Sequence, residues 1–224
     1  MVGLARKRIL IADDHEVVRE GLKITIGRKG KDLEVVGEAG TGKETLAQVA
    51  KLQPDLVMMD IRMPEGDGVE ATSLIREKYP STQVLILTTY AEEELLIESL
   101  RAGASGYLLK DTPGEQLVQA IRTVLSGGTV IDSAQLMSLF KEESIPVRSH
   151  GTGLSGKNAP VLSERETEIL QLMVDCKTNS EISTMLNLSE GTVRNYVSHI
   201  YEHLEVRHRA EAVLAAITLG MARR

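Results

Sequence analysis

Apolar runs alternate with amphipathic segments through the first 125 residues of this 224-residue chain. Short apolar runs are typical of buried strands, and the segments between them carry apolar residues at helical spacing. Strands are predicted near 8–12, 34–39, 55–60, 84–88 and 106–109, and helices near 15–28, 43–52, 67–78, 91–102 and 113–126. Strands that alternate with helices form a parallel sheet covered on both faces. The pattern therefore predicts a doubly wound α/β domain.

Polar side chains stand at the carboxyl ends of four predicted strands. Asp13 and Asp14 follow the first strand, and Asp60 closes the third. Thr88 closes the fourth strand and Lys110 follows the fifth. Open α/β sheets bind ligands at this edge, and carboxylate oxygens suit a hard cation such as Mg²⁺, which often shares its site with a phosphate. We therefore expect a phosphoryl-acceptor site here.

The order of these residues along the chain resembles the receiver domain of bacterial response regulators. The resemblance covers roughly the first half of the chain and implies a flavodoxin-like (βα)5 fold. It also implies that Asp60 accepts a phosphoryl group from a sensor histidine kinase. In such domains Asp14, Asp60 and the backbone carbonyl of Arg62 would hold Mg²⁺, and Asp13 would reach the ion through water.

The same resemblance assigns three further residues to a switch. Lys110 and Thr88 would contact the phosphoryl oxygens, and Tyr107 would be the aromatic switch residue. The charges explain the residue types, because clustered carboxylates repel one another and favour capture of a cation. A Thr88 hydroxyl drawn towards a new phosphate would leave space that Tyr107 can enter.

Composition indicates a soluble, globular, cytoplasmic protein. Hydrophobic residues make up 42% of the chain and charged residues 26%. No apolar run is long enough for a membrane span, and the N-terminus lacks the apolar segment of a signal peptide. The single cysteine, Cys176, excludes an internal disulfide and fits a reducing compartment.

A stretch rich in Gly, Ser and polar residues separates two predicted domains. We expect a receiver domain over 1–126, a linker with a short helix (133–140) over 127–159, and a second domain over 160–224. A long segment of this composition is typical of a linker between compact domains.

The second domain is predicted to be an all-α four-helix unit that contains a helix-turn-helix. Ser163 and Glu166 form a capping-box pattern at the first helix. Asn179 is expected to cap the second helix and Ser189 the third, and a fourth helix is expected from about Arg209 to Gly220. A short helix, a tight turn and a longer helix are the parts of a DNA-binding helix-turn-helix.

The motifs of this domain resemble the LuxR-type DNA-binding domain. They are the segments starting at Leu162 (LSERETEIL), Asn179 (NSEIS) and Leu188 (LSEGTVRN). Together with the receiver, they identify the chain as similar to the NarL/FixJ group of response regulators. Three positions depart from the usual pattern: Cys176 and Glu205 stand where Gly is common, and Tyr196 stands where His is common.

The third helix is expected to lie in the major groove of double-stranded promoter DNA. Arg194 would read guanine, Asn195 adenine, and Ser198 would add a polar base contact. The expected phosphate contacts are Asn179, Ser189, Thr192, Arg207 and Arg209.

Residues 160–224 carry 7 Lys and Arg against 9 Asp and Glu, so one copy should bind DNA weakly. We therefore expect a homodimer when the protein is phosphorylated or bound to DNA. The apolar face of the fourth helix (Val213, Ala216, Ile217, Gly220) would serve either as the dimer surface or as core.

Two other functions compete with a phosphorylation-gated transcription factor. A metal-dependent phosphatase would share the strand-end carboxylates. Such enzymes need a second acid two residues beyond the nucleophile, where this chain has Arg62. The sequence therefore predicts no enzyme of that class. A regulator with a vestigial receiver would bind DNA independently of phosphorylation, but the expected receiver residues are intact.

Overall fold

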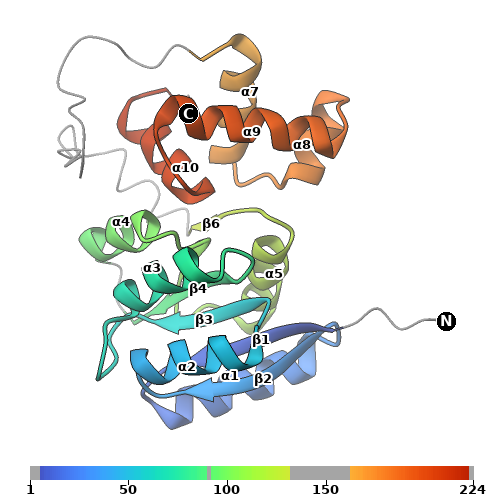
Figure 1. Ribbon diagram of the computed structural model, residues 1–224. Coiled ribbons are helices and arrows are strands. Elements are labelled where there is room, and N and C mark those ends of the chain that lie inside the picture. The colour runs from blue at the N-terminus through green and yellow to red at the C-terminus, as the bar shows by residue number, and fades with distance from the viewer. Residues whose placement is uncertain (1–5, 90–91, 132–161, 222–224) are drawn as a thin grey trace.

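The computed structural model describes residues 6–89, 92–131 and 162–221, which form a sheet domain and a helical domain (Figure 1). The strands are β1 (Lys7–Ala12), β2 (Leu33–Ala39), β3 (Leu56–Asp60), β4 (Gln83–Thr88), β5 (Gly106–Leu109) and β6 (Val130–Ile131). The helices among them are α1 (Glu16–Lys29), α2 (Gly42–Leu52), α3 (Gly68–Lys78), α4 (Glu93–Arg101) and α5 (Gly114–Leu125). The five predicted strands and five predicted helices are confirmed. The helix expected at 133–140 lies outside the described residues.

All strand pairs are parallel, in the order β2-β1-β3-β4-β5-β6. The chain reverses its direction of travel across the sheet between β1 and β3, and open sheets of this kind bind ligands at the carboxyl ends of such strands. The short strand β6 was not predicted: Val130 pairs with Gly106, and Ile131 pairs with Tyr107. The sheet therefore continues past residue 126, where we expected the first domain to end. The rest of the proposed division into domains stays a prediction.

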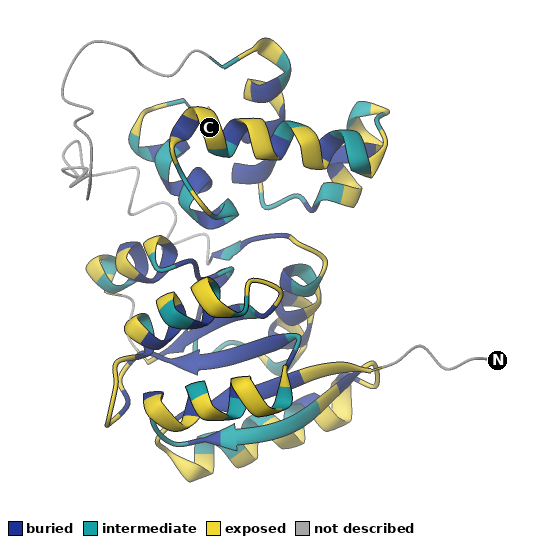
Figure 2. Cartoon of the chain, viewed as in Figure 1, coloured by how far each residue is buried: buried dark blue, intermediate teal, exposed yellow. Residues whose placement is uncertain are grey.

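Helices cover both faces of the sheet and enclose two hydrophobic clusters. Helices α1 and α5 lie on one face, and α2, α3 and α4 lie on the other (Figure 1). In β1, Leu10 faces α2, α3 and α4, whereas Ile9 and Ile11 face α1 and α5. This is the alternation of side chains that a strand requires. Strand β3 is buried at every position, and Figure 2 shows the central strands in dark blue. Because these strands are buried, the polar residues at their carboxyl ends lie at the edge of the core.

The helical domain consists of α7 (Glu164–Val174), α8 (Asn179–Leu186), α9 (Glu190–Leu204) and α10 (Arg209–Thr218). The capping box of Ser163 and Glu166 is confirmed, and Ser189 caps α9 by accepting a hydrogen bond from the backbone N–H of Thr192. The expectation that Asn179 caps α8 is wrong. Thr178 is the cap, because Glu181 stands three residues after it and completes a second capping box.

No helix in the described ranges is long and apolar enough to cross a membrane. The longest of them, α9, has 15 residues. A span of the bilayer core takes about 20 apolar residues.

Three helices of this domain end on left-handed residues that are not glycine. After α8 this residue is Asn187 (φ 53°), a residue type that tolerates the conformation. Cys176, just after α7, has φ 58°, and Glu205, after α9, has φ 54°. Glycine is the usual residue at such positions because a Cβ clashes there with the following carbonyl. Both departures from the LuxR-type pattern therefore carry backbone strain.

The two domains touch through α10 and α4. Side chains of both domains belong to one hydrophobic cluster, in which Val213, Ala216 and Ile217 of α10 are buried. Gly103, just after α4, lies so close to the helical domain that a Cβ built there would come within 2.6 Å of Cδ2 of His208. The apolar residues that we considered as a dimer surface are thus covered in this arrangement, whereas Gly220 is exposed.

Candidate functional site

Four side chains meet at the carboxyl ends of the adjacent strands β1 and β3. Ligand atoms of Asp13, Asp14, His15 and Asp60 all lie within 4.8 Å of one another. Asp13 and Asp60 are buried because they continue buried strands, whereas Asp14 is exposed. The structure therefore brings together the three carboxylates that the sequence predicted.

Lys110 reaches the same point from the end of β5. Its Nζ lies 2.6 Å from Oδ2 of Asp13 and 2.8 Å from Oδ2 of Asp60. Burial lowers the pKa of the ammonium, but hydrogen bonds to both carboxylates outweigh this and the pKa is raised. Lys110 therefore stays charged and compensates part of the negative charge of the cluster.

Opposing effects act on the pKa of the Asp60 carboxyl group. Burial is the largest, and it raises the pKa of the carboxyl group; the Lys110 hydrogen bond and charge lower it, and the Asp13 charge raises it again. The net direction is upward, so the folded site disfavours this negative charge. A further cation, or replacement of the charge, would relieve that cost.

The donor set fits Mg²⁺. Asp13, Asp14 and Asp60 offer hard oxygen ligands, two of them on buried side chains, and carboxylates of this kind bind Mg²⁺ alongside phosphate oxygens. Arg62 lies in the loop after β3, where its Nη2 pairs with Oε1 of Glu92 at 2.6 Å. The role expected of its backbone carbonyl stays a prediction.

Thr88 and Tyr107 lie beside this cluster, at the end of β4 and within β5. Both are buried, and Tyr107 is completely enclosed. Burial raises the pKa of the Tyr107 phenol, and a hydrogen bond with Thr88 offsets part of that rise. We expected Tyr107 to enter space that Thr88 leaves. In this structure the apolar core encloses the Tyr107 ring and Thr88 hydrogen-bonds its hydroxyl group, and the expected movement on phosphorylation stays a prediction.

Two residues of this site were not predicted from the sequence. Nδ1 of His15 lies 2.7 Å from Oδ1 of Asp14, and the backbone N–H of His15 donates to Oδ1 of Asp13. Nη1 of Arg19 donates to the backbone carbonyl of Asp13 at 2.7 Å. Adjacency to the acid pair was the available signal for His15. Arg19 lies one helical turn further on, so α1 brings it back to the loop.

In the helical domain, the predicted base-reading residues share the solvent side of α9. Arg194, Asn195 and Ser198 are exposed, while Val193 and Val197 face the core. Arg194 forms an ion pair of 3.6 Å with Glu190 one turn earlier. An exposed pair of this kind contributes little, so the guanidinium remains available to a partner.

The predicted phosphate contacts fall into two groups. Ser189 and Thr192 lie at the exposed N-terminus of α9, where their hydroxyls are 2.9 Å apart. Asn179 and Arg209 instead hydrogen-bond each other at 2.9 Å, and Arg209 lies with Arg207 in the cavity between the domains. As DNA contacts, Asn179, Arg207 and Arg209 stay predictions for an arrangement in which the domains have separated.

Both halves of the chain match known families. Residues 9–122 match the response regulator receiver domain, and residues 160–216 match the bacterial regulatory proteins of the luxR family. These two matches correspond to the sheet domain and the helical domain.

Relatives match over the whole length. The transcriptional regulatory protein LnrK of Bacillus subtilis is 39% identical, over 96% of this chain and 98% of its own. The oxygen regulatory protein NreC of Staphylococcus carnosus is 42% identical, over 94% of this chain and 96% of its own. Among solved structures, the response regulator ChrA of a haem-sensing two-component system is 32% identical with a TM-score of 0.52, and the match covers 97% of this chain and 100% of that one.

Proposed function

The chain belongs to the two-component response regulators of the NarL/FixJ type, and from this premise we propose that phosphorylation of Asp60 controls pairing on DNA through α10. Members of the family are transcriptional regulators that join a receiver to a LuxR-type DNA-binding domain. In this proposal the protein works in the cytoplasm, receives its phosphoryl group from a sensor histidine kinase, and binds double-stranded promoter DNA as a homodimer.

The observation that carries the proposal is the buried contact of Asp60 with Lys110 beside Asp13. A carboxylate oxygen of Asp60 attacks the phosphorus atom of a phosphohistidine, a P–O bond forms, and the P–N bond breaks with its electron pair returning to the histidine. The product is an acyl phosphate. Lys110 can move from the carboxylates to a phosphoryl oxygen without leaving the site, because a flexible stem carries its charge.

Asp13, Asp14 and Asp60 would hold Mg²⁺, with the backbone carbonyl of Arg62 as a further ligand. When bound, the ion supplies positive charge against the carboxylates and the phosphoryl group. The chain's own residues prepare the site, since Arg19 and the backbone of His15 fix the loop that carries Asp13.

We infer that the receiver acts on DNA binding through the contact between α4 and α10. The Thr88 hydroxyl now bonds Tyr107, and a phosphoryl group on Asp60 would compete for it. Tyr107 belongs to the same hydrophobic cluster as α4 and α10. A change in the packing of Tyr107 would therefore alter the contact between these helices. The base-reading residues Arg194 and Asn195 are already exposed. We therefore infer that phosphorylation frees α10 for pairing and does not need to uncover α9.

The first test is labelling by acetyl phosphate in the presence of Mg²⁺. Asp60→Asn should abolish the label, and Asp111→Asn should keep it, because Asp111 is an exposed acid just beyond Lys110 and outside the cluster. Labelling that persists in Asp60→Asn would overturn the assignment of the acceptor.

The second test is selection of bound DNA fragments with and without beryllofluoride, which mimics the phosphoryl group. We expect two half-sites and stronger binding with beryllofluoride. Equal DNA affinity in both conditions would show that the receiver does not gate binding, which is the vestigial-receiver alternative.

A further inference from the structure

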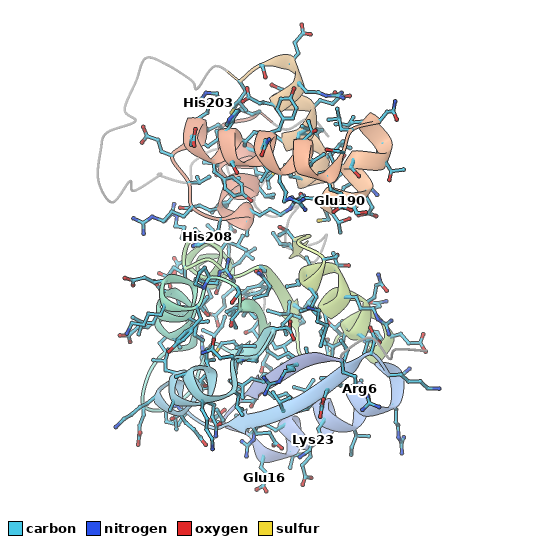
Figure 3. All side chains as sticks on the ribbon, turned by 45° about the vertical axis from the view of Figure 1, so that its right-hand side comes forward. Arg6, Glu16, Lys23, Glu190, His203 and His208 are labelled. Carbon is cyan, nitrogen blue, oxygen red and sulfur yellow. The ribbon has the colours of Figure 1, made fainter. Side chains whose placement is uncertain are left out.

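A cavity of about 180 Å³ lies between the two domains, away from Asp60. Figure 3 labels His208 at this boundary, on the side of the helical domain that faces the sheet domain. The residues of its lining that matter here are Arg76, Ser105, Thr129, Arg207, His208 and Arg209. Arg76 comes from α3 and Thr129 from the turn before β6, so both domains contribute to the walls.

The described lining of the cavity carries several positive charges. Arg76 of one domain faces Arg207 and Arg209 of the other, and none of the described lining residues is Asp or Glu. Glu181 and Glu211 lie close by, but their carboxylates accept the backbone N–H groups of Thr178 and Arg207. Like charges thus meet across the domain boundary. We call the arrangement in which α10 contacts α4 the closed arrangement. The like charges disfavour it unless a counter-charge is present.

Several donors of the lining have no hydrogen-bond partner in the part of the chain that the structure describes. Nε of Arg76, Nε of Arg209 and the Thr129 hydroxyl are buried and make no hydrogen bond within the described residues. Nη1 of Arg76 donates to the carbonyl oxygens of Pro80 and Thr82, and Nη1 of Arg209 donates to Asn179, so neighbouring groups hold both guanidiniums in place. Buried donors without a partner destabilise a fold by roughly 1–3 kcal/mol each, which favours a ligand that accepts from all of them.

The burial of these arginines agrees with the same conclusion. Desolvation is the largest effect on Arg76 and Arg209, and it lowers the pKa of both guanidiniums. Desolvation also lowers the pKa of His208 to about 4, so this imidazole is neutral at pH 7 and can accept or donate a hydrogen bond. An acceptor with negative charge is the missing partner.

We propose that the cavity binds a small oxyanion of the phosphate class, which joins Arg76 of the sheet domain to Arg209 of the helical domain and stabilises the closed arrangement. The volume suits an ion of that size and is below that of ordinary sites for larger ligands. Guanidinium groups bind phosphate oxygens strongly and with defined geometry. This inference goes beyond the proposed function, since it concerns the domain boundary and does not involve Asp60.

A ligand that binds only the closed arrangement must oppose every process that requires the open one. Free phosphate would therefore weaken pairing through α10 and the DNA binding that depends on it. A phosphate of the DNA backbone has the same chemistry, so the test must distinguish the two sources.

The experiment uses the full chain, free of Mg²⁺, and measures binding of inorganic phosphate by calorimetry against chloride at equal ionic strength. We expect Arg76→Gln and Thr129→Val to weaken phosphate binding by about tenfold each, the loss of one good hydrogen bond to an anion. Arg101→Gln is the matched control, because this exposed arginine on α4 is not among the cavity residues. It should bind phosphate as the wild type does.

Thr129→Val also separates the proposal from an effect on folding. Without a ligand, removal of an unsatisfied buried hydroxyl should leave the protein as stable or more stable. A variant that is stable but binds phosphate less well supports the site. Absence of phosphate binding by the wild type, or equal binding by Arg76→Gln and the wild type, would overturn it. Competition between phosphate and duplex DNA that does not depend on Arg76 would assign the anion to the DNA surface and also overturn it.

Discussion

Replacement of Glu205 by glycine should stabilise the helical domain. Glu205 ends α9 with φ 54° and ψ 39°, a left-handed conformation in which its Cβ is strained. Relief of this strain is worth roughly 1 kcal/mol. For a domain of about 60 residues, that corresponds to a rise of roughly 4–8 °C in Tm.

The control is the same substitution three residues earlier. Glu202 is exposed like Glu205 but lies within α9, where its backbone is helical. Glu202→Gly should therefore destabilise the domain by roughly 1 kcal/mol, because glycine is a poor helix former. The two variants remove the same atoms and the same charge, so only the backbone conformation distinguishes them.

Native-state hydrogen exchange of α9 peptides in the full chain is the appropriate measurement. It reports the opening free energy of this helix separately from the receiver. We expect protection to rise in Glu205→Gly and to fall in Glu202→Gly. Equal changes of the same sign in both variants would refute the argument from backbone strain.

Three further predictions concern the other sites. Mg²⁺ should stabilise the wild type by roughly 1.4 kcal/mol at ten times its Kd, as measured by thermal unfolding, and Asp60→Asn should lose most of this effect. Burial and the charges of Arg76 and Arg207 lower the pKa of His208 to about 4, so its contribution to the free energy of unfolding is fully present above its ordinary pKa of 6.5. The free energy of unfolding should therefore fall by roughly 1–2 kcal/mol between pH 6.5 and 4, as measured by chemical denaturation. His208→Gln should flatten this dependence on pH. Arg194→Ala should cost about 1–3 kcal/mol of DNA binding and relax selectivity at one base, as measured by competition between duplexes, whereas a uniform loss over all sequences would show a contact to phosphate alone.

The receiver half was predictable because its signals are local and regular. Buried strands appear as apolar runs, and polar residues follow them directly, so the meeting of Asp60 and Lys110 follows from the parallel order of the strands. The strand β6 escaped prediction because it has only two residues and forms by pairing with β5. No local pattern distinguishes so short a segment from a loop.

In the helical half, the correct cap of α8 was available from the sequence. Thr178 and Asn179 are both good cap residues, but only Thr178 has a glutamate three positions later. The contact of α10 with α4 could not be predicted from the sequence in this way, because it depends on how two folded domains pack together. An apolar helix face predicts that something covers it, and the sequence left a second copy and the core as alternatives. The structure adds the receiver as a third.

The contact between α4 and α10 joins two parts of one polypeptide, and this has a consequence for abundance. Dilution does not weaken an intramolecular contact, whereas pairing of two chains through the same helix follows mass action. If pairs form through α10, a rise in the number of molecules shifts the balance towards pairs even when Asp60 carries no phosphoryl group. Expression level would then act as a second input to the regulator, and overproduction would imitate the signal.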